Sequence, residues 1–220
     1  MSGPPRFDAQ AIAHPLLPGT ATANCVALGG SAPHLLLISG SNMSGKSTLL
    51  RTVGLNAVLA QAGAPVRAAH LTMTPLAIGA TLRIQDSLQA GRSRFFAEIS
   101  RIRDIVALTK AVRSDRRDDA GPDHVLFLLD ELLSGTNSHD RLQGATGILS
   151  GLVERGAIGL ATTHDLALTD IAVRMDGRAA NVHFDDRFED GRLIFDYTLK
   201  PGVVQSSNAI ALMRAIGLEV

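Results

Sequence analysis

The sequence contains a single cysteine, Cys25, which excludes an intramolecular disulfide and fits a reducing compartment. No apolar run approaches the roughly 18 residues that a membrane-spanning helix needs. The N-terminal stretch MSGPPRFDAQ lacks the basic and then apolar pattern of a secretory signal. Together these absences predict a cytoplasmic protein that has no membrane as a partner.

The sequence also lacks net charge, because Lys plus Arg and Asp plus Glu both number 21. Aromatic residues make up only 4% of it. The net charge therefore gives no indication that the chain binds DNA. The chain of 220 residues has the length of one large domain or of a domain with appendages, and its 45% of hydrophobic residues is enough for a core.

The most informative stretch is GSNMSGKST, residues 40–48. The apolar run at 34–39 predicts a buried strand before it, and the apolar spacing from Thr48 to Ala62 predicts a helix after it. A strand, a glycine-rich loop and a helix are the context in which this pattern binds phosphate. The alternative is a chance glycine-rich turn, which the Lys and Ser in register make the weaker interpretation.

Each position of the loop has a physical role in holding phosphate. Gly40 and Gly45 permit backbone angles that let successive N–H groups converge on one anion, and the helix N-terminus adds partial positive charge. Lys46 is expected to reach the β- and γ-phosphates, and the Ser47 hydroxyl to bind Mg²⁺. The predicted nucleotide-binding residues are Gly40, Ser41, Asn42, Met43, Ser44, Gly45, Lys46, Ser47 and Thr48.

Two further polar sites follow apolar strand runs. In VLFLLDELLSGTN, residues 125–137, Asp130 is expected to hold Mg²⁺ and Glu131 to deprotonate the attacking water. The alternative is an acidic helix start with Asp130 as its N-cap. His164 follows the run at 157–162 and is a catalytic candidate near the γ-phosphate, although a lone histidine is otherwise an ordinary loop residue.

The rest of the chain completes an α/β pattern. The charged stretch Arg113–Asp123 predicts a solvated connection, and two apolar runs around Glu189-Asp190-Gly191 predict a β-hairpin. A last short helix is expected at Ser207–Leu218. Alternating strands and helices predict a sheet that is covered on both faces.

GSNMSGKST, DELLSGTNS and TTH, in this order, resemble the ATPase domain of the MutS family. The family's phosphate loop characteristically carries Asn-Met, here Asn42-Met43. The likeness extends to RIQDSLQAGRSRFFAEISRI, residues 83–102, although Arg94 stands where the family usually has Thr. By this resemblance, Ser93 reaches across a dimer to the γ-phosphate of the other subunit.

The resemblance implies a P-loop NTPase of the ABC type, with a mostly parallel central sheet, helices on both faces and a C-terminal β-hairpin. It divides the chain into an N-terminal segment at 1–33 that contributes to the nucleotide site, a core at 34–200, and the start of a helical dimerisation element at 201–220. ATP and Mg²⁺ are the implied cofactors. Asn24 is an implied nucleotide contact, but Thr20, Ala21 and Thr22 stand where the family has a bulky residue against adenine.

Phe96-Ala97-Glu98 has the spacing of the Phe-x-Glu triplet with which MutS proteins wedge a mismatched base. That wedge belongs to a different, N-terminal domain. We therefore expect Phe96 to be a core residue of a helix, and Glu98 to be solvated.

The leading functional hypothesis is a MutS-type ATPase module that dimerises around nucleotide, as a homodimer or as part of a longer MutS-like dimer. It would drive a DNA clamp in mismatch repair or a related DNA transaction. DNA would be held by regions other than this chain. One alternative is a non-enzymatic interaction module of a divergent MutS-like protein, in which nucleotide binding controls the interaction and which has no role in repair. Another is a transporter-type ABC ATPase, whose Leu-Ser-Gly-Gly-Gln signature is replaced here by AGRSRFF.

Overall fold

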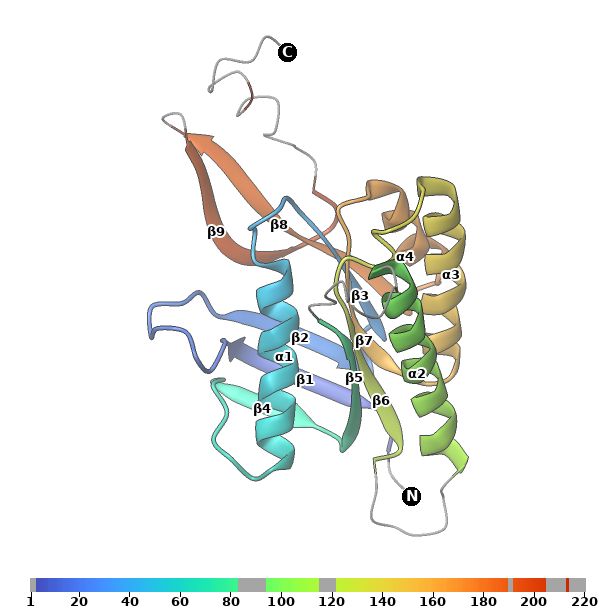
Figure 1. Cartoon of the computed structure of the whole chain (residues 1–220). Coiled ribbons are helices and arrows are strands. Elements are labelled where there is room, and N and C mark those ends of the chain that lie inside the picture. Colours follow the sequence, from blue (N-terminus) through green and yellow to red (C-terminus); the bar gives the residue numbers. More distant parts are fainter. Residues whose placement is uncertain (1–2, 83–93, 115–121, 190–191, 205–212, 214–220) are drawn as a thin grey trace.

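The structure is a computed structural model that describes residues 3–82, 94–114, 122–189, 192–204 and 213. Its centre is a six-stranded sheet with the strand order β5-β6-β7-β3-β8-β9 (Figure 1). The strands are β3 (Leu35–Ser39), β5 (Leu76–Thr81), β6 (His124–Leu129), β7 (Ile158–Thr162), β8 (Ala179–Glu189) and β9 (Arg192–Pro201). All neighbours pair in parallel except β8 and β9, which form an antiparallel hairpin. The predicted mostly parallel sheet and C-terminal hairpin are thus both present.

The three strands that the apolar runs predict are β3, β6 and β7. Every residue of β3 and of β7 is buried, because helices or a second sheet cover both faces of the central sheet. A strand that is buried on both faces has no polar side to show, which is why these runs are continuous rather than alternating.

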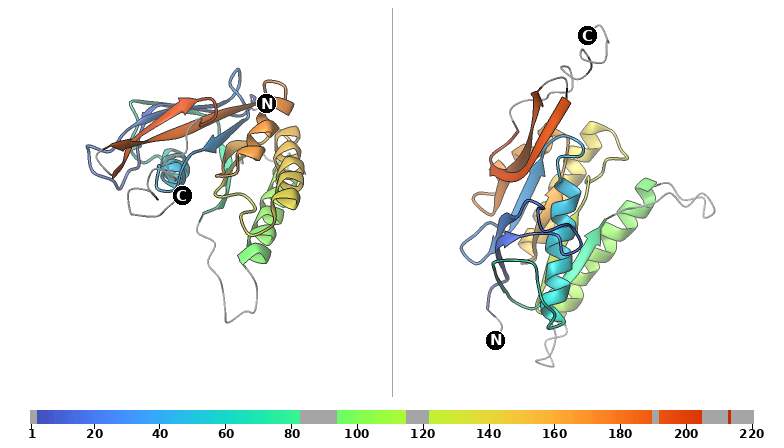
Figure 2. Two further views of the ribbon diagram at one scale, coloured as in Figure 1. Left: turned by 90° about the horizontal axis from the view of Figure 1, so that it is seen from above. Right: turned by 90° about the vertical axis from the view of Figure 1, so that its left-hand side faces the viewer.

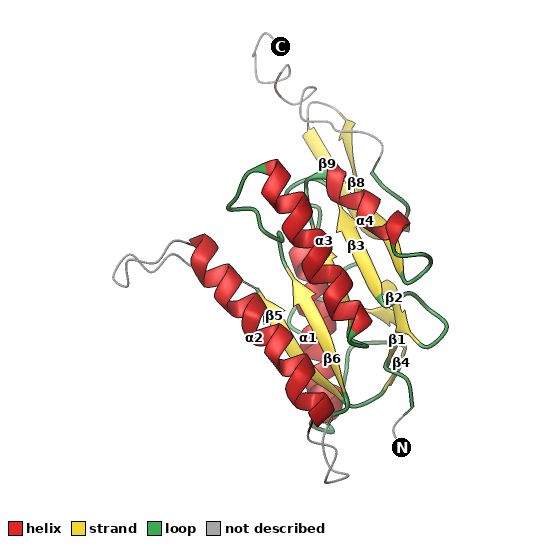
Figure 3. Cartoon of the chain, turned by 90° about the vertical axis from the view of Figure 1, so that its right-hand side faces the viewer, coloured by secondary structure: helices red, strands yellow, loops and turns green. Residues whose placement is uncertain are grey.

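Helices lie on both faces of the central sheet (Figures 1 and 3). The helix α1 (Lys46–Gln61) packs on one face together with Leu36 and Ile38 of β3. Leu35 and Leu37 of β3 point to the other face, which is covered by the remaining helices. These are α2 (Arg94–Ser114), α3 (Ser138–Glu154) and the short α4 (Asp170–Arg174).

A second, antiparallel sheet has the order β2-β1-β4. It consists of β1 (Arg6–Ile12), β2 (Asn24–Gly29) and β4 (His70–Met73). Its buried side chains, Phe7, Val26 and Leu28 among them, join the same core cluster as α1. Figure 2 shows this sheet from two further directions, on the α1 side of the central sheet. The N-terminal strands therefore lie beside the start of α1.

Some predicted elements differ from the structure or lie outside it. The helix α1 begins two residues before the predicted Thr48, and α2 continues to Ser114, inside the stretch predicted as a connection. The helix predicted at 207–218 lies outside the described residues except for Met213. Among the described residues, no helix has the length and apolar character to cross a membrane.

Candidate active site

Three parallel strands bring the predicted site residues to one edge of the sheet. β3 leads into the loop at 40–48, β6 ends before Asp130, and β7 ends at Thr162. β7 lies between β6 and β3, so its last residue, Thr162, lies next to both the loop and Asp130. Ligands of open α/β sheets bind at this carboxyl edge.

The loop at 40–48 adopts backbone angles that favour glycine. Gly40 has φ of 138° and Gly45 has φ of 105°, as the sequence predicts for a loop that wraps an anion. A Cβ atom on Gly40 would lie 2.8 Å from the carbonyl oxygen of Phe184, so the close approach of β8 also requires glycine there. Met43 has φ of 67° and is 84% exposed at the tip of the loop.

Lys46 lies inside this loop and is only 5% exposed. Its ammonium group donates hydrogen bonds to the carbonyl oxygens of Gly40 (2.7 Å) and Ser41 (2.6 Å). Burial lowers the pKa of Lys46 from its ordinary value, and the charges of Glu131, Asp130 and Asp186 oppose that shift. The amine is thus held among oxygens at the base of the loop.

Asp130 accepts two hydrogen bonds on one carboxylate oxygen. Ser47 Oγ donates to Oδ1 over 2.9 Å, and Thr162 Oγ1 donates to the same atom over 2.8 Å. The backbone N–H of Asp130 donates to Thr81 Oγ1 over 3.2 Å. A carboxylate and a hydroxyl are hard oxygen ligands, the kind that Mg²⁺ takes beside phosphate and water. Ser47 and Asp130 therefore fit the metal site predicted for them.

Sequence reasoning missed Thr162 and Thr81, which end β7 and β5. Thr162 Oγ1 also accepts a hydrogen bond of 2.8 Å from the backbone N–H of Glu131. Glu131 has φ of 49°, an uncommon angle for a residue with a side chain, and is half-buried. Thr162 lies 32 positions after Asp130 in the sequence, so no local pattern pointed to its contact with the acidic pair.

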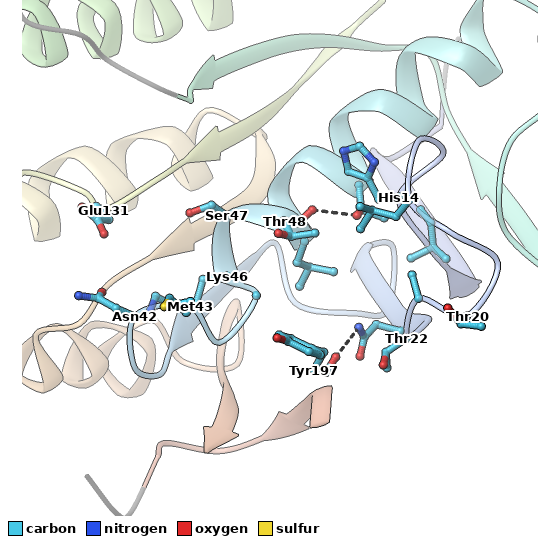
Figure 4. A pocket seen from close by; sticks show the side chains of 17 residues that line it. His14, Thr20, Thr22, Asn42, Met43, Lys46, Ser47, Thr48, Glu131 and Tyr197 are labelled. Carbon is cyan, nitrogen blue, oxygen red and sulfur yellow. Dashed lines mark hydrogen bonds between the residues drawn. The ribbon is translucent and has the colours of Figure 1, made fainter. Parts of the chain in front are cut away.

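A cavity of about 500 Å³ opens beside the loop and the start of α1 (Figure 4). Glu131 and Asn42 lie at one end of it, and His14 and Thr20 lie at the other. Its lining comes from the loop at 40–48 and α1, from β1, β2 and the segment between them, from the turn after β6, and from β9. The lining residues are Ile12, His14, Leu17, Thr20, Ala21, Thr22, Asn24, Asn42, Met43, Gly45, Lys46, Ser47, Thr48, Leu49, Thr52, Glu131 and Tyr197.

Tyr197 of β9 lines the cavity and was not among the residues that the sequence predicted for the site. Its aromatic ring lies between the two ends of the cavity (Figure 4). Asn24 holds its backbone, because Asn24 Nδ2 donates to Tyr197 O over 3.0 Å and Asn24 Oδ1 accepts from the Leu199 N–H over 2.7 Å. Asn24 thus lines the cavity as predicted, but its amide is bonded to β9.

The other predicted residues are placed less directly. Gly40, Ser41 and Ser44 build the loop but are not among the lining residues of the cavity. In the described part of the chain, the hydroxyls of Ser41 and Ser44 are buried without a hydrogen-bond partner. His164 is exposed just after β7, and Ser93 lies outside the described residues. Their functional roles stay predictions.

The expectation for Phe96 and Glu98 is wrong. Phe96 is 51% exposed and Glu98 is 4% exposed. Glu98 Oε1 accepts a hydrogen bond of 2.7 Å from the backbone N–H of Leu133, in the turn that follows Glu131. The helix α2 therefore presents Glu98, and not Phe96, to the protein interior.

Comparisons with known proteins agree with this geometry. The model of MutS domain V matches residues 36–219. The chain is 33% identical to the endonuclease MutS2 of Thermus thermophilus over 97% of its own length. It is 36% identical to the DNA mismatch repair protein MutS of Thermus aquaticus over 85% of its length, and 31% identical to the DNA mismatch repair protein MSH6 of Arabidopsis thaliana over 98%.

The aligned part amounts to 26%, 21% and 16% of these three relatives, so the chain spans about a quarter of their length or less. Two of their names refer to DNA mismatch repair and one to an endonuclease. The family model covers most of the chain, including the loop at 40–48 and the acidic pair after β6. The chain belongs to the MutS family.

Proposed function

We propose that this chain is an ATPase module of the P-loop type, which binds Mg·ATP in the cavity beside α1 and hydrolyses it. The observation that carries the proposal is the hydrogen bond of 2.9 Å between Ser47 and Asp130, residues 83 positions apart. It brings the loop at 40–48 into contact with the end of β6, beside a cavity of about 500 Å³ that Ser47 lines. Pockets of roughly 300–1,000 Å³ hold small-molecule ligands and cofactors.

Different residues of the chain bind the phosphates, the adenine base and the Mg²⁺ ion. The loop N–H groups and Lys46 hold the phosphates, and the N-terminus of α1 adds partial positive charge. Tyr197 supplies an aromatic face for the adenine base of ATP, in place of the bulky residue that is missing at 20–22. Mg²⁺, held through Ser47 and Asp130, neutralises charge on the phosphates when it is bound.

Glu131 is the proposed general base. It lies at the phosphate end of the cavity, near the loop and Asp130, and its backbone is fixed by Thr162. A carboxylate there accepts the proton of the water that attacks the γ-phosphate. His164 follows β7 at the same edge of the sheet and is the second candidate for contact with that water.

The module is proposed to act as a dimer, in which Ser93 of one subunit completes the site of the other. Its hydrolysis cycle drives a DNA clamp formed by other regions of a longer protein, in DNA mismatch repair. The names of two relatives support the repair role, and the name of the third leaves room for another DNA transaction. Membership of the MutS family argues against the transporter-type alternative.

Single-turnover hydrolysis of Mg·ATP by the full chain tests the proposal. We expect turnover that requires Mg²⁺ and falls by about 10²-fold or more in Asp130→Asn, because the neutral amide holds the cation poorly. Asp8→Asn, a change of an acidic residue on β1 away from the cavity, is the matched control. Binding without turnover by the wild-type chain would favour the nucleotide-gated module instead.

A further inference from the structure

Glu98 is an acidic residue whose position the proposed chemistry does not yet explain. It lies in the first turns of α2 and is 4% exposed. A carboxylate removed from water is costly unless hydrogen bonds compensate it. Its Oε1 accepts the backbone N–H of Leu133 over 2.7 Å, so the carboxylate is directed at the turn after β6.

That turn has an uncommon backbone. Glu131 has φ of 49° and Leu133 has φ of 54°, both in the left-handed region that residues with side chains seldom adopt. Such angles cost free energy and persist only where neighbouring groups hold them. The direction of the Glu131 side chain thus depends on contacts that keep the turn in this shape.

The peptide groups of Leu133 are held from two helices. Glu98 of α2 binds its N–H, and Arg141 Nε of α3 donates to its carbonyl oxygen over 3.1 Å. Arg141 also donates to Thr136 O over 2.8 Å and pairs with Asp165, next to His164, over 3.2 Å. The turn is therefore fixed at both sides of its second left-handed residue.

α2 touches the same turn at a second point. A Cβ atom added to Gly135 would lie 3.2 Å from Cβ of Phe95, so the first turn of α2 packs directly on the backbone of the loop. Phe95 itself packs against the core cluster that contains Leu132 and Leu133. The position of α2 and the shape of the turn are thus linked by packing as well as by the Glu98 hydrogen bond.

We propose that Glu98 is a positioning residue, which holds the left-handed turn and thereby aims Glu131 at the attacking water. The inference rests on the proposed function, because it requires Glu131 to be the base. It makes the rate of hydrolysis depend on the position of α2, whereas nucleotide binding depends on the loop at 40–48. Glu98 does not line the cavity, so it acts through Glu131.

Steady-state hydrolysis of Mg·ATP by Glu98 variants of the full chain provides the test. Glu98→Leu leaves the Leu133 N–H without its acceptor, so kcat falls by about tenfold or more while KM changes by less than about twofold. Glu98→Gln keeps an oxygen acceptor and retains most of the activity. Asp104→Leu, which removes an exposed carboxylate from the same helix, is the matched control.

A double-mutant cycle separates positioning from general damage. If Glu98 acts through Glu131, Glu98→Leu lowers the residual rate of Glu131→Gln by less than about twofold, because the base is already lost. An equal loss in both backgrounds overturns the inference. If circular dichroism shows that Glu98→Leu does not fold, Glu98→Asp replaces it in the test. The shorter side chain moves the carboxylate away from the Leu133 N–H by one methylene, and the same changes in kcat and KM are expected.

The two proposals fail in different ways. If the wild-type chain binds Mg·ATP but never turns it over, the proposed function fails, and the inference falls with it. If the wild type hydrolyses ATP and Glu98→Leu does so at the same rate, only the positioning role of Glu98 is overturned.

Discussion

The ammonium group of Lys46 donates a hydrogen bond of 2.7 Å to the carbonyl oxygen of Gly40, the first residue of the same loop. The positive charge of Lys46 is therefore removed from water and directed into the loop. Phosphate oxygens carry formal charge and carbonyl oxygens do not, so phosphate is the better partner for this group.

Replacing Lys46 by alanine should weaken Mg·ATP binding by about tenfold or more, which corresponds to about 1.4 kcal/mol. The change removes the positive charge inside the phosphate loop. Calorimetric titration of the folded variant measures it, with the exposed Lys110→Ala on α2 as the control. An unchanged affinity for Mg·ATP would contradict the proposal that this loop binds the phosphates.

Replacing Glu131 by glutamine should separate binding from chemistry. Asp130 and Ser47 remain in place, so Mg·ATP affinity is expected to stay within about twofold of wild type. The amide cannot accept the proton of water, and single-turnover hydrolysis should fall by roughly 10²-fold or more. The exposed Glu154→Gln at the end of α3 is the control. Equal rates in wild type and variant would transfer the role of base to His164.

The sequence predicts the parts of the site that depend on local pattern. The strand, loop and helix around Lys46 are contiguous, and Asp130 follows a short apolar run that is typical of a buried strand. Strand ends on a parallel sheet meet at one edge, so the convergence of these segments follows from topology. Thr162 and Thr81 were missed because a hydroxyl at a strand end has no distinctive pattern.

The remaining residues depend on contacts between distant segments. Tyr197 enters the cavity because Asn24, 173 positions earlier, binds its carbonyl group. Phe96 and Glu98 were assigned to the wrong sides of α2, since apolar residues such as Phe95, Phe96 and Ile99 occupy more than one face of this helix. The buried face of α2 packs on β5, β6 and the turn at 131–136, and these contacts between distant segments cannot be seen in the sequence spacing.

Replacing Tyr197 by alanine should weaken binding of Mg·ATP much more than binding of Mg·tripolyphosphate. In the proposed site the ring contacts the adenine base, and stacking of a base on an aromatic side chain contributes about 1–3 kcal/mol, or about 5- to 140-fold in affinity. Tyr197→Phe keeps the ring and should bind ATP nearly as wild type. Ile194→Ala, at another exposed position of β9, is the control. An equal loss of affinity for both ligands would show that Tyr197 supports the fold and does not contact the adenine base.

Two inactive variants should restore activity when they are mixed, if Ser93 completes the site of a partner subunit. Ser93→Arg leaves the Lys46 loop of its own subunit intact, and Lys46→Ala leaves its own Ser93 intact. A heterodimer of the two then contains one complete site out of two. Hydrolysis is measured after mixing, with heterodimers verified by differently tagged chains. No recovery in verified heterodimers would count against completion in trans.

The last prediction concerns DNA, and it is a prediction of weak binding. Recognition of a mismatch requires an apolar wedge in the minor groove and enough Lys and Arg contacts to hold the backbone against salt. This chain has no net charge and 4% aromatic residues. Phe96 is half exposed, but it lies on α2 beside a buried Glu98, which is bonded to the turn and not available to a base.

We therefore expect the chain alone to bind a duplex with one G·T mismatch no better than the matched duplex. Both dissociation constants should be on the order of 10⁻⁵ M or weaker at physiological salt. Fluorescence anisotropy with the paired duplexes measures the difference, and Phe96→Ala is the variant that identifies a wedge. A preference of about tenfold or more for the mismatch, lost in Phe96→Ala, would place recognition in this chain. An equal and weak affinity for both duplexes would instead assign mismatch recognition to other regions of a longer protein and leave this chain the proposed ATPase.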